Sequence, residues 1–316
     1  MSDPEVSEES EYESMSVDEL FERGKSLFKD KKYLESTEFF SRALERKSGD
    51  DPLHYSLRNY YLWYADSLLT NEEQSSNIFS SNVDEGSDST LPSAETVLEA
   101  AKTSENNQND EMLAFEMFQF GYECFMNYFK HLETNNEVPE QDDVLDASYC
   151  LVRLGDIFYT NHQFEMSSKD YENAIKLREK HGLSPKHLAS LYISLAQSQM
   201  FNGKLKESLE TFSKSRELLE ELLEEEGEDT EVLKNTLEDV TIQIEDLEKL
   251  ISESSNTGDE VAKGSQSNAA SLIPKTTSSF DKRQLDTSVV KTRVVDINVG
   301  DVVGKKRRVD LSKVYE

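Results

Sequence analysis

The chain has 316 residues and a formal net charge of −30, from 34 Lys and Arg against 64 Asp and Glu. This acidity argues against nucleic-acid binding, which needs basic side chains to neutralise phosphates, and favours basic partners, although solubility alone is the alternative explanation. Two cysteines and five scattered histidines predict neither a disulfide framework nor a metal site. No apolar run approaches the roughly 20 residues that span a bilayer. We therefore expect a soluble intracellular protein without metal or cofactor.

The N-terminal elements are marked by composition and by a capping signal. Residues 1–15 are rich in Ser and Glu, which predicts disorder. Ser16 and Glu19 have the spacing of a capping box, in which each side chain bonds the other residue's backbone N–H, so a helix is expected to begin here. We expect a turn at residues 30–32 and a second helix that ends near Gly49.

The next helix pair is interrupted. Asp51-Pro52 predicts a helix start, with Asp as the cap and Pro at the first helical position, and that helix runs to about Leu69. Residues 71–109 are rich in Ser, Asn, Glu and Asp, and we interpret them as an acidic insertion, structureless except for a short helix near residues 96–101. The second helix of the pair is expected to resume at Asp110.

Two uninterrupted helix pairs follow. The third is predicted from about Asp142 to Lys180, with a turn at residues 161–162. The fourth begins at Ser184-Pro185, turns at Asn202-Gly203 and ends near Glu226.

A last amphipathic helix is predicted over residues 230–251. Its apolar residues alternate four and three apart, which gives one apolar stripe: Leu233, Leu237, Val240, Ile244, Leu247 and Ile251. We expect it to cap a helical array, because a terminal repeat cannot leave its core face in water. A dimerising coiled coil, and hence a homodimer, is the alternative.

The C-terminal residues 252–316 are polar and predicted to be disordered. They contain a basic cluster at residues 305–309, formed by Lys305, Lys306, Arg307 and Arg308, which is typical of a nuclear localisation signal, although such clusters also occur by chance. From residue 255 onward the net charge is +3, so residues 1–254 carry −33.

A repeated pattern of a small residue, an aromatic and a second small residue connects the helix pairs. The aromatic lies 16 residues after the first small residue, and the second small residue lies 19 after it, in three places: Gly24, Phe40 and Ala43; Gly155, Tyr171 and Ala174; Ala196, Phe212 and Ser215. A small residue lets two helices approach closely, and the aromatic fills the space between them. Self-similarity of this kind predicts an all-α array of helix hairpins.

This pattern resembles the tetratricopeptide repeat (TPR). The split second pair resumes at Met112-Leu113-Ala114-Phe115 and is similar to that of the interrupted-repeat (SHNi-TPR) histone chaperones. This family includes the nuclear autoantigenic sperm protein and its fungal relatives, which associate with the type-B histone acetyltransferase. The resemblance covers residues 17 to about 251. It implies an all-α TPR-like superhelix over residues 16–251, with a C-terminal capping helix and disordered tails.

The resemblance also implies a function. The protein would chaperone core histones, chiefly H3–H4, and support their acetylation, nuclear import and deposition into chromatin, from the nucleus and a cytoplasmic pool. We expect no enzyme, because the sequence has no Gly-rich phosphate loop, no paired metal ligands and no Ser/His/Asp arrangement.

Two candidate histone-binding sets follow, with a solvated face or linker as the alternative for each. The first helices of TPR hairpins line the groove, which places one set there: Asp66, Tyr149, Asp156, Tyr159 and Gln197. The other set consists of acidic residues in or near the insertion: Glu72, Glu73, Asp84, Glu85, Asp88 and Glu116.

Two other functions remain open. A TPR adaptor that grips an acidic C-terminal peptide needs a clamp of Lys, Asn and Arg, but the corresponding positions hold Phe21, Lys25, Trp63, Tyr149 and Arg153. Most of that clamp is therefore missing. A scaffold for a non-histone partner, with incidental acidity, is the other alternative.

Overall fold

A computed structural model describes residues 12–81, 94–224, 230–256, 297–298 and 308–309, with side chains over 12–74, 110–224 and 231–253. The chain divides into two compact units, one of residues 1–138 and 287–316 and the other of residues 139–286, and each is described by itself. The expected all-α class is confirmed. The described residues add one short antiparallel pairing, of β1 (Ile297–Asn298) with β2 (Arg308–Val309).

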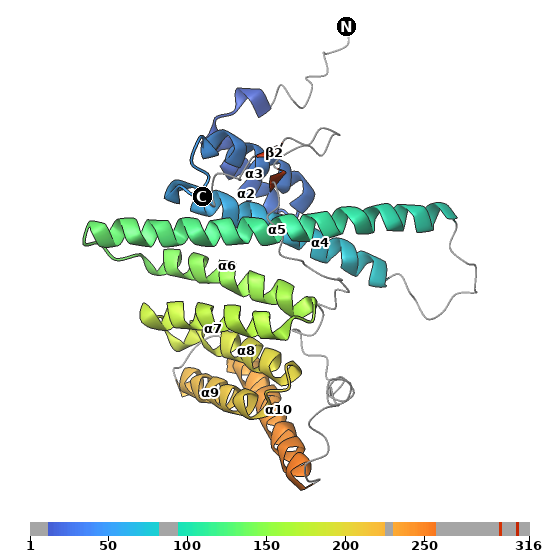
Figure 1. Ribbon diagram of the computed structural model, residues 1–316, viewed down its shortest axis with the longest axis vertical. Coiled ribbons are helices and arrows are strands. Elements are labelled where there is room, and N and C mark those ends of the chain that lie inside the picture. The colour runs from blue at the N-terminus through green and yellow to red at the C-terminus, as the bar shows by residue number, and fades with distance from the viewer. Residues whose placement is uncertain (1–11, 82–93, 225–229, 257–296, 299–307, 310–316) are drawn as a thin grey trace. The chain divides into compact units, whose positions relative to one another are not determined.

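The first unit is built from two helix hairpins (Figure 1). The helix α2 packs on α3, α3 packs on α4, and α4 packs along α5. Their bounds are α2 Val17–Lys29, α3 Tyr33–Ser48, a 3-10 turn η1 Tyr55–Leu57, α4 Arg58–Ser81 and α5 Ala94–Thr134.

Local signals explain the first hairpin. The Glu19 amide donates to the Ser16 hydroxyl (3.3 Å), and the Ser16 amide donates to the Glu19 carboxylate (2.8 Å), so the expected capping box is present. These hydrogen bonds hold the pKa of Glu19 below its usual value. The turn into α3 places Lys31 at φ 62°, in the left-handed region.

The predicted disorder of residues 1–15 is wrong for its last part. Residues 12–14 form a helical turn, and Tyr12 is 9% exposed. The Tyr12 ring packs edge-on against Phe39 (5.0 Å between centroids) and under Arg42 (4.1 Å), while Arg46 donates to the Tyr12 carbonyl (2.9 Å). The tyrosine thus joins the start of the chain to α3, and residues 1–11 lie outside the described part.

The expected helix start at Asp51-Pro52 is also wrong. The Asp51 carboxylate accepts from the Leu53 amide (3.1 Å), which makes a turn, and Pro52 lies in that turn. The helix α4 begins only at Arg58. Asp therefore stabilises a local turn here, which its short side chain does as readily as it caps a helix.

The interruption after α4 is narrower than the predicted insertion 71–109. Helix α4 continues to Ser81 and α5 begins at Ala94, so residues 71–81 and 94–109 are helical. Residues 82–93 lie outside the described part. Polar composition predicted a break, but Glu and Gln are good helix formers, and each Ser or Asn costs less than about 0.7 kcal/mol of helix propensity relative to Ala.

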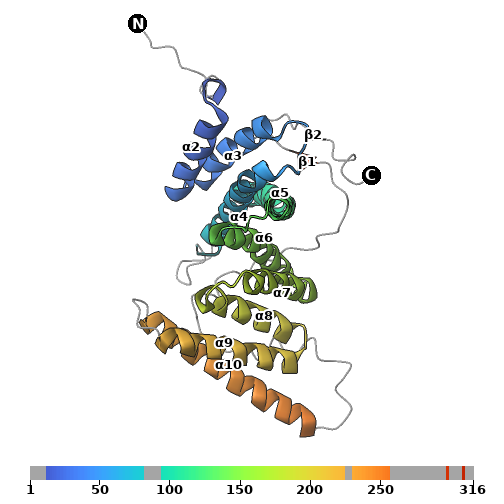
Figure 2. The same ribbon diagram turned by 90° about the vertical axis from the view of Figure 1, so that its left-hand side faces the viewer.

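The second unit is a row of hairpins (Figure 2) closed by one long helix. Turns at His162 (φ 57°) and Gly203 (φ 79°) lie at the two hairpin turns expected from the sequence. The bounds are α6 Gln141–Thr160, α7 Phe164–Lys180, a 3-10 turn η2 Pro185–His187, α8 Ala189–Phe201, α9 Leu205–Glu224 and α10 Thr230–Asn256.

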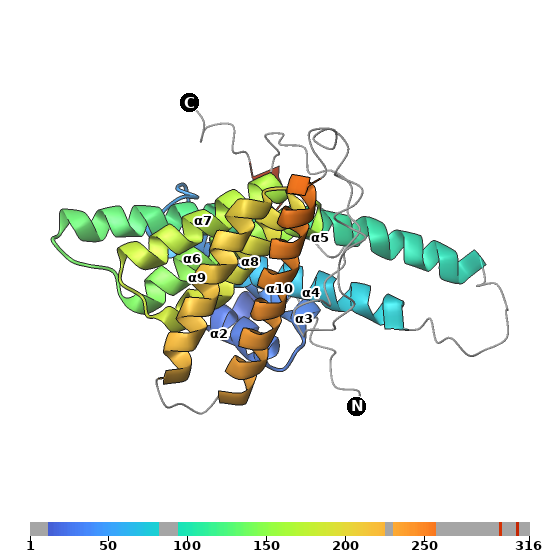
Figure 3. The same ribbon diagram turned by 90° about the horizontal axis from the view of Figure 1, so that it is seen from below.

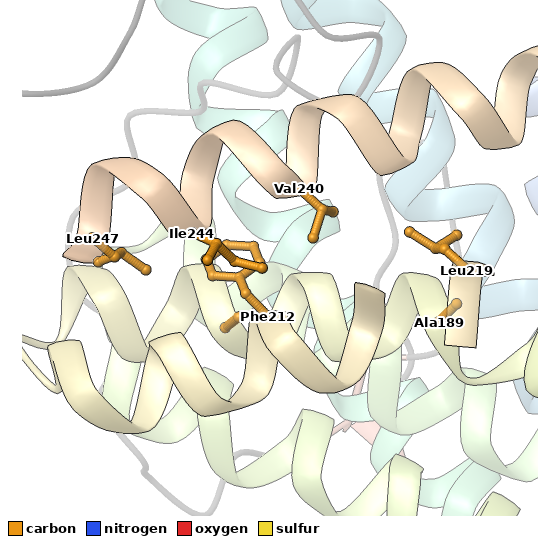
Figure 4. Close-up of a cluster of buried hydrophobic side chains, with 7 residues drawn as sticks. Ala189, Phe212, Leu219, Val240, Ile244 and Leu247 are labelled. Carbon is orange, nitrogen blue, oxygen red and sulfur yellow. The ribbon is translucent and has the colours of Figure 1, made fainter. Parts of the chain in front are cut away.

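Helix α10 lies along α9 (Figure 3) and covers the core of this unit. Val240, Ile244 and Leu247 of its predicted apolar stripe are buried around Phe212, as Figure 4 shows. The helix extends beyond the expected end at residue 251 to Asn256. Leu233 and Leu237 of the stripe are partly buried against the same core, so the helix packs as the expected cap.

Close approach of helices occurs where the small residues predicted it. A Cβ atom added to Gly24 would lie 2.7 Å from the Phe40 ring, and one added to Gly155 would lie 2.7 Å from the Tyr171 ring. In the interrupted hairpin, Phe118 and Gly121 on α5 repeat the same three-residue spacing, and both are buried. The repeat therefore continues across the interruption.

Candidate functional site

Three of the predicted groove residues form one stripe on α6. Tyr149, Asp156 and Tyr159 are spaced by seven and three residues, which places them on one helical face, and all three are partly exposed. Gln197 is also partly exposed and holds the corresponding position on α8, one residue after the small Ala196. These four residues lie in the second unit, and the predicted Asp66 lies on α4 of the first.

Asp156 is held by the protein's own side chains. The Tyr171 hydroxyl donates to Asp156 Oδ1 (2.8 Å), and Arg153 Nη1 lies 3.4 Å from Oδ2. The Asp156 side chain is 27% exposed, whereas that of Arg153 is 5% exposed. Burial, together with the neighbouring Asp156 charge, raises the pKa of Tyr171 well above its usual value, so the hydroxyl stays a donor.

Aromatic rings flank this carboxylate along the stripe. The Arg153 guanidinium lies 5.9 Å from the centre of the Tyr149 ring. Tyr159 packs edge-on against Phe164 (5.5 Å) and Phe201 (5.8 Å). The stripe thus presents aromatic surface around a carboxylate whose charge Arg153 partly balances, an arrangement suited to stacking on a cationic side chain.

The predicted acidic residues of the first unit differ in exposure. Asp66 on α4 is partly exposed, as is Glu73. Glu72 is only 3% exposed, so its carboxyl does not form part of the surface that the sequence suggested. Glu116 is partly exposed, and burial raises its pKa to about 7; burial likewise raises the pKa of Asp110 to about 6.

A second buried carboxyl lies level with Glu72. Tyr61 of α4 contacts Phe120 of α5 (5.6 Å between ring centroids), which sets the register of the antiparallel hairpin. Glu72 lies eleven residues after Tyr61 and Glu111 nine residues before Phe120, so both are at the same level within about 3 Å along the helices. Glu111 is 4% exposed. The interrupted end of the hairpin therefore has acidic residues in its interior as well as on its surface.

Several predicted residues cannot be placed. Asp84, Glu85, Asp88, Lys305, Lys306 and Arg307 lie outside the described residues. Arg308 belongs to β2, where it is paired with Asn298 of β1.

The sequence did not reveal the partners of Asp156. Tyr171 was identified only as the packing aromatic of its repeat, and Arg153 only as a clamp position. A signal existed, because the other packing positions carry Phe40, Phe118 and Phe212, and only the third repeat has a hydroxyl there that needs a partner. An acidic α9–α10 surface was also missed: these two helices carry thirteen acidic and five basic residues.

Within the described ranges, no three His, Cys, Asp or Glu side chains are grouped so that they could hold a metal ion. None of the described helices combines the length and apolar character needed to cross a membrane. Both Cys124 and Cys150 are buried free thiols.

Comparison with known proteins identifies the hairpin that carries the stripe. Residues 148–184, which include most of α6 and all of α7, match the sequence profile of the SHNi-TPR family. The chain carries an SHNi-TPR repeat. This confirms the family resemblance predicted from the sequence, and it places Tyr149, Asp156, Tyr159 and Tyr171 within the SHNi-TPR hairpin.

Comparison of whole structures extends the fold assignment beyond the SHNi-TPR hairpin. The chain is similar to the yeast histone chaperone Hif1, described as a scaffold protein that recruits protein complexes to core histones. The two share 13% sequence identity with a TM-score of 0.52, over 73% of this chain and 94% of the Hif1 chain. No curated protein sequence matches significantly. At this identity the similarity shows a common fold.

Proposed function

We propose that this protein is a histone chaperone that binds core histones, H3–H4 in particular, and does so without catalysis. The observation that carries the proposal is the SHNi-TPR match over residues 148–184, the hairpin that presents the aromatic and acidic stripe. The fold shared with Hif1, a histone chaperone by its description, supports it.

The charge of the protein suits a strongly basic partner. Residues 1–254 carry a net charge of −33, and much of this charge is on exposed side chains such as those of α9 and α10. Exposed carboxylates attract a basic protein over a Debye length, about 8–10 Å at physiological salt, and speed its association. They also keep a bound histone from nucleic acid by occupying its Lys and Arg side chains.

The stripe on α6 would supply contacts that charge alone does not. Tyr149 and Tyr159 are partly exposed aromatics, the residue type that most often anchors a protein interface, and Asp156 between them is held in one orientation by Tyr171. Because Arg153 already balances Asp156, we expect the tyrosines to contribute more to affinity than this carboxylate does. Asp66, Glu73, Glu116 and Gln197 complete the proposed contact set among the described residues.

The proposal extends to the cellular setting. Partnership with a type-B histone acetyltransferase, nuclear import through Lys305 to Arg308, and a cytoplasmic pool would place the protein between histone acetylation and deposition. The non-histone scaffold remains the competing function and predicts no affinity for histones.

A titration with purified histones tests the proposal. We expect H3–H4 to bind at low salt, with affinity that falls as salt is raised. Tyr149→Ala should weaken binding about tenfold, whereas Tyr128→Ala, which removes a partly exposed tyrosine of α5, should leave it unchanged. Absence of binding at low salt, or equal loss in both variants, would contradict the proposal.

A further inference from the structure

A hollow of about 660 Å³ lies beside the turn between α2 and α3, in the first unit. Three aromatic residues form its walls: Phe28 packs edge-on against Tyr33 (5.0 Å) and against Trp63 (5.4 Å). Three lysines, Lys25, Lys29 and Lys31, also line it, together with one carboxylate, Glu22. In a chain with net charge −30, a hollow with three ammonium groups is a local exception.

The lysines of this hollow differ in their partners. Lys25 lies 2.9 Å from Glu22 and lies over the Trp63 ring at 5.8 Å. Lys29 and Lys31 are exposed, and neither has a carboxylate within ion-pair distance among the described side chains. Lys31 is also fixed by its turn, since its φ of 62° belongs to the left-handed region. Two ammonium groups are thus available to a ligand at the edge of an aromatic hollow.

A second, smaller hollow of about 260 Å³ continues the surface. It shares Lys31 and Tyr33 with the first and adds Leu34, which is apolar yet 55% exposed. The other added lining residues are polar: Lys32, Glu35, Asn71 and Gln74, of which Lys32 lies 3.3 Å from the Glu35 carboxylate. The two hollows are continuous through Lys31 and Tyr33, and together they are lined by four lysines and two glutamates around aromatic and aliphatic surface.

We propose that this paired hollow binds an acidic peptide segment of a partner protein, with one aromatic or aliphatic side chain packed against the rings of Phe28, Tyr33 and Trp63. The carboxylates of the segment would pair with Lys29 and Lys31, while the rest of the protein's surface repels the same segment and so confines it here. The occupant is opposite in charge to a histone, so this surface is separate from the proposed histone site and does not depend on it.

Trp63 makes the proposal measurable, because it is the only tryptophan in the chain. The probe is a short peptide of Glu, Asp and Ser around one central Phe, which contributes no fluorescence under selective tryptophan excitation. Titration into the full chain should change the Trp63 emission saturably. Lys29→Gln with Lys31→Gln should weaken this binding about tenfold, as expected for two surface ion pairs with an oriented ligand.

Controls separate a site from a general charge effect. The pair Lys180→Gln and Lys204→Gln removes the same charge from the other unit and should leave the titration unchanged. The Lys29 and Lys31 variant should still bind H3–H4. A peptide with Gln and Asn in place of Glu and Asp should bind at least tenfold more weakly.

Three outcomes would overturn the proposal. One is an unchanged Trp63 emission at saturating peptide, and another is equal weakening by the two lysine pairs. The third is a response only from a chain that lacks residues 1–11, since the occupant would then be the chain's own acidic N-terminus and not a partner.

Discussion

The Tyr171 hydroxyl connects a packing position of the repeat to the surface stripe. It donates to Asp156 at 2.8 Å from a largely buried site. We predict that Tyr171→Phe destabilises the fold by about 1.5–3 kcal/mol, because the hydrogen bond is to a charged acceptor and the hydroxyl is removed without a clash. Denaturant unfolding followed by circular dichroism measures this loss.

A double-mutant cycle with Asp156→Ala, which removes the acceptor, assigns the loss to the pair. If the hydrogen bond carries it, the two single changes should be non-additive by about 0.5 kcal/mol or more. Strict additivity would show that Tyr171 acts through packing alone. The same variants test Asp156 in function: if its role is to hold the hairpin, histone affinity should fall only as far as the folded fraction falls.

Residue identity predicted packing better than it predicted polar contacts. Gly24 and Gly155 correctly predicted where two helices approach closely, because the missing Cβ makes room for the aromatic ring 16 residues later. Tyr149, Asp156 and Tyr159 were assigned to one face by their positions relative to the small residue of the repeat, on the pattern of a TPR array. The link from Asp156 to Tyr171 joins two helices, and one sequence gives helix registers but not which polar atoms meet.

At the scale of the element, the break in the α4–α5 hairpin should be dispensable for folding. The hairpin has its own core, in which Tyr61 contacts Phe120 and Asn127 donates to the Leu53 carbonyl (3.0 Å), and loop-closure cost changes little with length. We predict that a Gly-Ser linker of equal length in place of residues 82–93 changes the free energy of unfolding by less than about 0.5 kcal/mol.

The same replacement removes Asp84, Glu85 and Asp88, so it should weaken H3–H4 binding and reduce its salt dependence. Restoring three Asp residues within the linker should recover the affinity for H3–H4 if residues 82–93 contribute to binding through their charge alone. Loss of stability by more than about 1 kcal/mol would instead show that these residues support the hairpin.

The elements that periodicity and the Ser16 capping box marked were predicted closely, whereas the cap signal at Asp51-Pro52 and the boundaries drawn from composition were wrong. The α2 start at Ser16 and the hairpin turns of the second unit follow from local hydrogen bonding and positive φ, which are fixed within a few residues. The order at Tyr12 depends on Phe39 and Arg46, which are distant in sequence, and α4 packs along α5, which follows it after the interruption. Composition cannot report either contact.

At the scale of the whole molecule, the excess of acid extends into the helix packing. Burial raises the pKa of Glu116 to about 7 and those of Asp110 and Asp170 to about 6. A carboxyl whose folded-state pKa is raised binds more protons in the native state than in the unfolded state. Its contribution to stability is therefore present at low pH and is lost as the pH rises through the folded-state pKa. Self-repulsion within a chain of charge −30 acts in the same direction.

We therefore predict a higher Tm at about pH 5 than at about pH 8, and a specific contribution from Glu116. Glu116→Gln should stabilise the protein at about pH 8, by less than about 1 kcal/mol because the carboxyl is partly exposed, and the gain should vanish near pH 4, where the native carboxyl is already neutral. Glu210→Gln removes the same charge from an exposed position on α9 and serves as the control. If the two variants show the same dependence on pH, net charge and not burial governs the effect, and the interior of the α4–α5 hairpin has no part in it.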